Sequence, residues 1–168
     1  IRDRVVTDAD KRAKIAEYYK ANWYANNRTR SQRQRTGPDA PSEGQVQRLV
    51  SSAMYLADHF HDVPVLIIGC YQGRPNDPSP KAQAGLYGSI LPAVWSLMLA
   101  LRARGLGATW TTLHLPNETE IAELLGIPND VTQAALLPVA YFKGEDFKPA
   151  KRLPIKDRTF WNSWGHTR

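Results

Sequence analysis

The spacing of apolar residues predicts two helices in the first third of the chain. Asp8 is placed to cap the first, which carries Ile15, Tyr18 and Tyr19 and runs to about residue 23 or beyond. Ser42 is placed to cap the second, whose apolar residues recur every three or four positions. These apolar residues are Val46, Leu49, Val50, Ala53, Met54, Ala57 and Phe60. Between the helices, residues 26–43 are polar and rich in arginine, so we expect a mobile lid or loop there.

Four runs of β-branched and apolar residues predict strands. Residues 1–6 resemble the end of a strand, and residues 65–71 a buried central strand. Residues 108–115 form a third run. Residues 132–142 form a fourth, in which Pro138 favours an edge position or a bulge, because proline cannot donate to a β-ladder.

The segment between the second and third of these strands predicts a loop and then a long apolar helix. Residues 72–83 contain several prolines and are expected to be a loop. Ser89 is a plausible cap for the helix, Pro92 lies near its first turn, and Gly105 ends it. The helix is apolar almost all round, which predicts burial on most faces and packing against a partner chain. A shorter helix over residues 118–125 is expected from the pair Asn117 and Glu120 and from Gly126.

Length and charge restrict the class of protein. A chain of 168 residues is long enough for one domain with a substantial core. Its net charge of +6 raises the alternative of a nucleic-acid-binding domain, but the basic residues are dispersed and no recognition motif is present. We expect no membrane span and no secretory signal, and therefore a cytoplasmic protein. The lone Cys70 is expected to be a small buried hydrophobe.

The residues that usually perform catalysis do not form a recognisable site. The sequence contains no nucleophile elbow, Rossmann fingerprint or Walker loop. His59, His61, His114 and His166 lack the spacing of metal ligands, so we predict no metal site and expect each to be a surface or core histidine. This scarcity of acid–base groups is compatible with a reaction carried out on a cofactor, which the protein only binds, orients and polarises.

Residues 86–113 contain a helix, a Gly-Leu-Gly break and the sequence Trp110-Thr111-Thr112-Leu113. This combination resembles the flavin-binding centre of the FMN-dependent nitroreductase family. The resemblance implies an α+β, three-layer fold over residues 1–168, with an antiparallel-rich central sheet flanked by helices. It also implies that the long buried helix lies at a dimer interface.

The resemblance also implies a set of cofactor-binding residues. Main-chain amides of Trp110, Thr111, Thr112 and Leu113 would face the flavin ring. Lys151 and Arg152, just before Leu153-Pro154, would hold the FMN phosphate, for which a guanidinium is well shaped. Ser89, at the predicted start of the long helix, is a further candidate.

The activity implied is that of a homodimeric NAD(P)H-dependent oxidoreductase. Two FMN sites at the subunit interface would pass hydride from NAD(P)H to a nitroaromatic, a quinone or a similar small molecule, with no protein residue as catalyst. On charge alone, arginines of residues 26–43 would meet the phosphates of the nicotinamide cofactor.

The family's amino-terminal Arg-Ser-x-Arg and Asn-x-Gln-Pro-Trp-like stretches are not present in this sequence. We therefore expect that the chain is truncated at its amino end. The alternative function is a non-catalytic relative of the same fold, either binding flavin or free of it.

Overall fold

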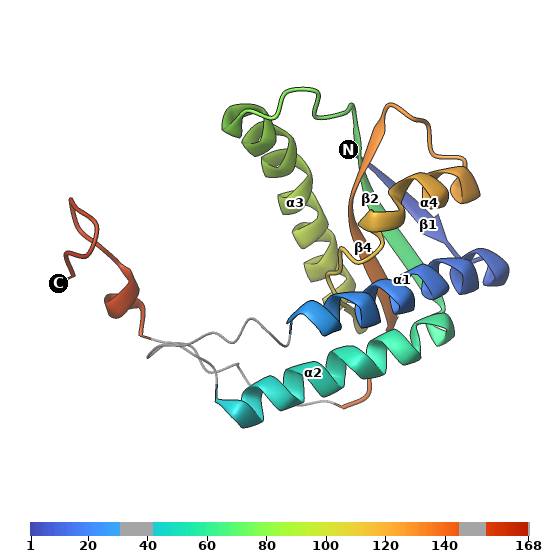
Figure 1. Ribbon diagram of the computed structural model, residues 1–168, viewed down its shortest axis with the longest axis horizontal. Coiled ribbons are helices and arrows are strands. Elements are labelled where there is room, and N and C mark those ends of the chain that lie inside the picture. The colour runs from blue at the N-terminus through green and yellow to red at the C-terminus, as the bar shows by residue number, and fades with distance from the viewer. Residues whose placement is uncertain (31–41, 145–153, 168) are drawn as a thin grey trace.

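The computed structural model describes residues 1–30, 42–144 and 154–167. Four strands and four helices are the main elements of these residues (Figure 1). In chain order they are β1 (Arg2–Val6), α1 (Ala9–Arg30), α2 (Glu43–Asp58), β2 (Val65–Gln72), α3 (Pro80–Arg102), β3 (Leu106–Ala108), α4 (Glu118–Leu125) and β4 (Val131–Tyr141). Short 3₁₀ turns cover Phe60–Asp62, Leu115–Asn117 and Ile155–Arg158.

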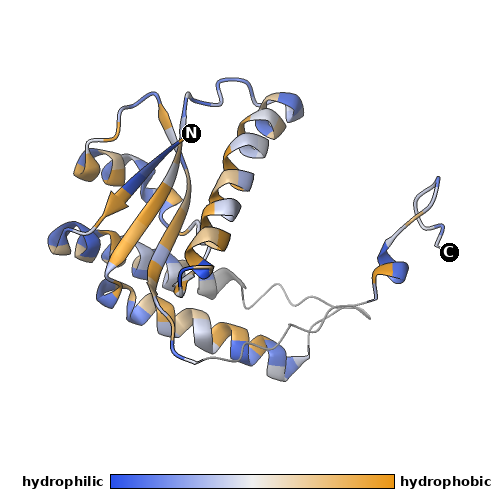
Figure 2. Ribbon diagram, turned by 180° about the vertical axis from the view of Figure 1, so that it is seen from behind, coloured by the Kyte–Doolittle hydropathy of each residue, from blue (hydrophilic) through white to orange (hydrophobic). Residues whose placement is uncertain are grey.

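The four strands form one antiparallel sheet with the order β1-β2-β4-β3. Helix α3 packs on one face, and α1 and α4 pack on the other, with α2 lying beside α1 (Figures 1 and 2). Two separate hydrophobic clusters follow from this arrangement, one on each face of the sheet. The expected α+β fold, with helices on both sides of an antiparallel sheet, is confirmed.

The alternation of side chains along β2 supplies both clusters. Leu66, Ile68 and Cys70 point into the cluster shared with α1 and α4, whereas Ile67 points toward α3. The predicted buried central strand is therefore confirmed. Gly69 also faces α3, and the helix approaches it so closely that a β-carbon there would lie 2.6 Å from Cγ2 of Val94.

Three of the predicted helix ends are confirmed, whereas Asn117 makes no side-chain capping bond to α4 and instead donates to the Glu120 carboxylate. The Asp8 carboxylate accepts from the Lys11 amide, and the Ser42 side chain accepts from the Gln45 amide. Gly126 ends α4 in the left-handed conformation, with φ of 63°.

The predicted loop over residues 26–43 starts too early, whereas its carboxyl end agrees with the predicted cap at Ser42 to within one residue. Helix α1 continues to Arg30, and α2 begins at Glu43. Residues 31–41 lie outside the described part of the chain.

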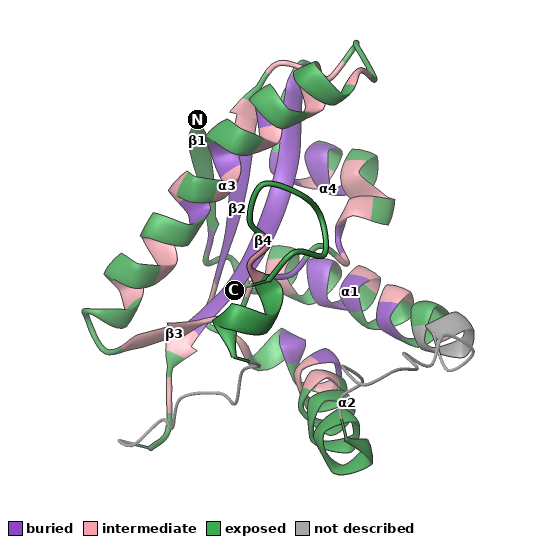
Figure 3. Cartoon of the chain, turned by 90° about the vertical axis from the view of Figure 1, so that its left-hand side faces the viewer, coloured by how far each residue is buried: buried purple, intermediate pink, exposed green. Residues whose placement is uncertain are grey.

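Helix α3 is longer and more exposed than predicted. It begins at Pro80, where Ser79 accepts from the Ala82 amide, so the last residues of the predicted loop are helical and Ser89 is not a cap. Only three of its residues are buried, and they pack in the cluster on this face of the sheet; they are Leu86, Ile90 and Val94. Most of the helix is coloured as intermediate or exposed in Figure 3. Trp95 and Leu99 are 56% and 55% exposed, so the prediction of burial on most faces was wrong for the single chain.

By length and composition α3 is the one helix among the described residues that is able to cross a membrane. No charged residue separates Lys81 from Arg102. The sequence had predicted a shorter helix, starting near Ser89, and no membrane span. In the fold, the Leu86 side of the helix is packed against the sheet, as expected for a core helix with one uncovered face.

Pro138 lies in an internal strand, so its predicted edge or bulge position was wrong. The register irregularity in β4 occurs elsewhere, opposite Gly69 and Cys70. Strand β3 and the isolated Thr111–Leu136 bridge share one register, in which Thr109 would stand opposite Pro138. The Leu136 N–H is directed toward the β3 side of β4. The main chain of residue 138, two positions further on, faces the same side, but proline has no N–H to donate there. Pairing therefore stops at Ala108, and the strand predicted over residues 108–115 is not continuous.

Candidate functional site

The segment that carries the predicted flavin contacts is fixed at one end by Thr111. Its amide donates to the Leu136 carbonyl at 3.0 Å, and its carbonyl accepts from the Leu136 amide at 2.9 Å. The Thr111 hydroxyl also donates to the Leu136 carbonyl, at 3.1 Å. The side chain is buried. Thr111 is thus an anchor to β4, and its own amide is already engaged.

Thr112 has the opposite orientation. In a trans peptide the C=O and the following N–H point in opposite directions, and the described residues contain no cis peptide bond. Because the Thr111 carbonyl points to β4, the Thr112 N–H points away from it. Thr112 is exposed. The fold therefore presents a main-chain donor and a hydroxyl outward at this position.

The other end of the segment is held by α1. The Asn22 side-chain amide donates to the Leu113 carbonyl at 2.8 Å and to Oδ1 of Asn117 at 2.9 Å. Within the turn, the Leu115 amide donates to the Thr112 carbonyl at 3.1 Å. Thr112 is consequently flanked by two residues, Thr111 and Leu113, that are hydrogen-bonded to different elements of the scaffold.

His114 lies beneath this turn with no exposed surface. Neither ring nitrogen has a hydrogen-bond partner among the described residues. Burial alone lowers the pKa of His114 to about 4, so the ring is neutral at physiological pH. The expectation of a surface or core histidine is confirmed here as a core histidine.

Two other histidines meet at one carboxylate. His59 Nδ1 and His61 Nε2 lie 3.2 and 3.3 Å from the two oxygens of Asp62, a convergence that we did not expect from their spacing. All three side chains are about half exposed. In the described part of the chain, no group of three potential ligands is arranged to hold a metal ion.

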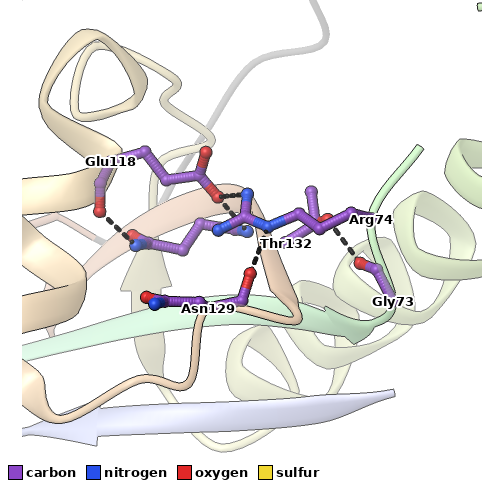
Figure 4. A network of polar contacts seen from close by, with 6 residues as sticks. Gly73, Arg74, Glu118, Asn129 and Thr132 are labelled. Carbon is purple, nitrogen blue, oxygen red and sulfur yellow. Dashed lines mark hydrogen bonds and ion pairs between the residues drawn. The ribbon is translucent and has the colours of Figure 1, made fainter. Parts of the chain in front are cut away.

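A polar network braces the start of α4, directly after the Thr111–Asn117 segment (Figure 4). Arg74 Nη1 lies 2.6 Å from Oε1 of Glu118, and Arg74 Nε donates to the Asn129 carbonyl at 2.8 Å. The same Glu118 oxygen accepts from the Gln133 amide at 2.9 Å, and the Glu118 carbonyl accepts from Gln133 Nε2 at 2.8 Å. Thr132 donates its hydroxyl to the Gly73 carbonyl. The network ties the end of β2 to α4 and β4.

The remaining predicted site residues are only partly placed. Trp110 is half-buried and packs with the cluster on the α3 side of the sheet. Ser89 lies on the exposed surface of α3 and donates its hydroxyl to the Gly85 carbonyl at 2.9 Å. Lys151 and Arg152 lie outside the described residues.

None of the predicted contact residues lines either of the following two hollows in the described surface. One, of about 260 Å³, lies beside the interrupted pairing of β3, where Thr109, Pro138 and Phe142 meet Leu56 and Val63. The other is formed within the carboxyl-terminal segment by Phe160 and Trp164 with their neighbours.

Cys70 is confirmed as a structural residue. It is buried, and its thiol donates to the Ile68 carbonyl at 3.6 Å. Burial raises its pKa to about 11, so the reactive thiolate is strongly disfavoured.

Solved structures show the same fold at low sequence identity. Iodotyrosine deiodinase bound to FMN and 3-iodo-L-tyrosine has 18% identity and a TM-score of 0.63, over 95% of this chain and 76% of that chain. A variant of an FMN- and NADPH-dependent nitroreductase from Sphigopyxis sp. strain HMH has 15% identity and a TM-score of 0.57, over 97% and 79%. The NADPH:FMN oxidoreductase of Vibrio harveyi, complexed with NAD⁺, has 14% identity and a TM-score of 0.54, over 99% and 60%.

At identities this low, the structural similarity establishes the fold only. The activities of those proteins are not thereby assigned to this chain. The sequence itself matches the nitroreductase family model over residues 4–141. This range contains the four helices and the strands β2, β3 and β4 of the described structure, most of β1, and the Thr111–Asn117 segment. The chain belongs to the nitroreductase family.

Proposed function

We propose that this protein is an FMN-dependent oxidoreductase that transfers hydride from NAD(P)H to a nitroaromatic, a quinone or a similar small acceptor. The observation that carries the proposal is the outward amide of Thr112, fixed between two anchored neighbours. Family membership and the FMN-containing relatives support it.

The donor set at Thr112 suits a flavin. FMN, when bound, supplies a ring that accepts and donates hydride and that carries negative charge when reduced. An exposed main-chain N–H and a hydroxyl are suitable partners for the electron-rich edge of such a ring. Thr111 contributes as an anchor, because its amide is engaged by Leu136. The other residues proposed to contact the cofactor are Trp110 and Leu113 at the ring, Lys151 and Arg152 at the phosphate, and Ser89.

We further propose that the active form is a homodimer, with α3 at its centre and the cofactor at the subunit interface. Helix α3 leaves an uncharged surface uncovered, on which Trp95 and Leu99 are more than half exposed. Exposed apolar patches of this kind are typical of protein interfaces. The carboxyl-terminal segment, which extends away from the domain body (Figures 1 and 2), exposes Trp164 and would contact the partner chain. We place the dimer in the cytoplasm.

The test is the absorbance spectrum of the purified protein, before and after addition of FMN. We expect visible flavin bands that shift on binding, and bleaching of these bands by NADH or NADPH without oxygen. Reoxidation by a quinone or a nitroaromatic completes the cycle. A protein that stays colourless after addition of FMN contradicts the proposal and favours a flavin-free relative. Bound flavin that no nicotinamide reduces favours a non-catalytic binding protein.

A further inference from the structure

We propose that Asn22, on helix α1, restrains the carboxyl side of the turn at Thr112 and acts together with Leu136, which holds the amino side, to keep the Thr112 amide directed toward the flavin. The inference rests on the proposed function, because it assigns a role to Asn22 in the same site. Asn22 is a positioning residue, since it contacts the segment and not the cofactor.

Asn22 makes two hydrogen bonds to one turn. Its side-chain NH₂ group donates both to the Leu113 carbonyl and to Oδ1 of Asn117, which lie at the two ends of the turn. The peptide that follows Leu113 is therefore held from α1. The peptide that precedes Thr112, which carries the Thr112 N–H, is held from β4 by Leu136. A main-chain donor pre-oriented in this way binds its acceptor without first losing conformational freedom.

The turn has few other restraints. His114, at its centre, makes no side-chain hydrogen bond among the described residues, so its ring packs without fixing an orientation by polar contacts. The Leu115 amide bonds only within the turn, to the Thr112 carbonyl. Among the described residues, the side chain that bonds to the Leu113 main chain is that of Asn22, which lies on a different element, helix α1. Removing its amide should loosen Leu113 and Thr112 together.

The experiment compares Asn22→Leu and Asn22→Ala with Tyr24→Phe in the full chain. Leucine is similar in shape to asparagine but cannot donate a hydrogen bond. Alanine provides a second variant if leucine packs poorly. Tyr24→Phe is the matched control, because it removes another α1 hydrogen bond, from the Tyr24 hydroxyl to Asp58, that does not touch the segment. Three quantities are measured for each protein: amide hydrogen exchange over residues 111–117 without cofactor, the Kd for FMN, and the midpoint potential of the bound flavin.

We expect both Asn22 variants to exchange faster over residues 111–117 and to bind FMN at least 10-fold more weakly. We also expect a more negative flavin potential, because a disordered amide stabilises the reduced ring less. Tyr24→Phe should match the wild type in Kd and potential.

Three results would overturn the inference. One is faster exchange in the Asn22 variants with an unchanged Kd and potential, which would make the clamp purely structural. The second is an equal loss in Tyr24→Phe, which would indicate general weakening of α1. The third is wild-type protein that binds no FMN, a result that removes the proposed function as well. In the first two the wild type still binds FMN, so the failures are distinguishable.

Discussion

Gly69 and Val94 are in such close contact that β2 and α3 can pack at their observed distance only if position 69 has no side chain. A β-carbon there would lie 2.6 Å from Cγ2 of Val94 and 3.8 Å from Cδ1 of Ile90. Valine is branched at Cβ and its χ1 is restricted, so it cannot easily move aside.

Gly69→Ala should therefore destabilise the protein by about 1–3 kcal/mol, the usual cost of overpacking a core. Chemical denaturation measures the free energy of unfolding. In a double-mutant cycle, Val94→Ala should be less harmful in the Gly69→Ala background than in the wild type. Strict additivity of the two substitutions would show that the contact is not the cause.

His114 should make the stability of the protein depend on pH. Its pKa is lowered to about 4 in the fold, against an ordinary value near 6.5, so between these values the unfolded chain binds more protons. Stability should therefore decline as pH falls from 6.5 to 4, by about 3 kcal/mol from this residue.

Replacing His114 by leucine removes both the titration and two buried nitrogens that lack partners. We expect stability near or above that of the wild type at pH 7 and a flatter profile between pH 4 and 6.5. Denaturant titrations across this pH range measure it, with His61→Gln as the control for an exposed histidine. A variant with the wild-type slope would refute the assignment.

Glu118 should be important for stability through the two groups that share its Oε1 atom. Glu118→Ala leaves the buried main-chain amide of Gln133 without its acceptor. It also leaves the Arg74 guanidinium without its carboxylate partner. We expect a loss of about 1–3 kcal/mol, and a smaller loss for Glu118→Gln, which keeps one acceptor oxygen. Glu120→Ala, on the exposed side of the same helix, should stay within about 0.5 kcal/mol of the wild type. Denaturation curves showing equal effects at 118 and 120 would count against this role for the network.

Leu99 should control subunit association if α3 forms the dimer centre. Leu99→Arg would bury an unpaired charge at the interface, so we expect a monomer with weakened FMN binding. Leu99→Met keeps an apolar side chain of similar volume and should remain dimeric. Sedimentation velocity distinguishes the 18.9 kDa chain from a species of twice that mass. A wild-type monomer, or an arginine variant that still dimerises, would exclude this arrangement.

Local sequence signals were sufficient wherever one short-range interaction decides the structure. Asp8, Ser42 and Gly126 mark helix ends because a side-chain oxygen or a left-handed glycine satisfies groups only a few residues away. The run around Ile68 predicted a central strand because the strand is covered on both faces.

Errors arose where two signals compete or where the deciding partner is distant. Ser79-Pro80 starts α3, but it follows a segment so rich in proline that it resembled more loop. Ser89 has the chemistry of a cap, yet it lies in the middle of that helix and bonds to Gly85.

The candidate site shows the same limit. The sequence suggested the Trp110–Leu113 segment as a flavin contact, which stays a prediction, but it gave no sign of Asn22, whose side chain donates to the Leu113 carbonyl. Asn22 and Leu113 are 91 positions apart, and no periodicity or motif links them. Arg74 and Glu118, 44 positions apart, are a second pair that only the fold brings together.

Pro138 also limits the length of the edge strand β3, to which a strand from another chain could be added. Because it withholds one N–H opposite Thr109, the outermost strand β3 has only three residues before its pairing is interrupted. Short outer strands are poor templates for the addition of a strand from another chain. The proline thus gives this border some protection against fibril-like growth while the protein is being synthesised or is partly unfolded.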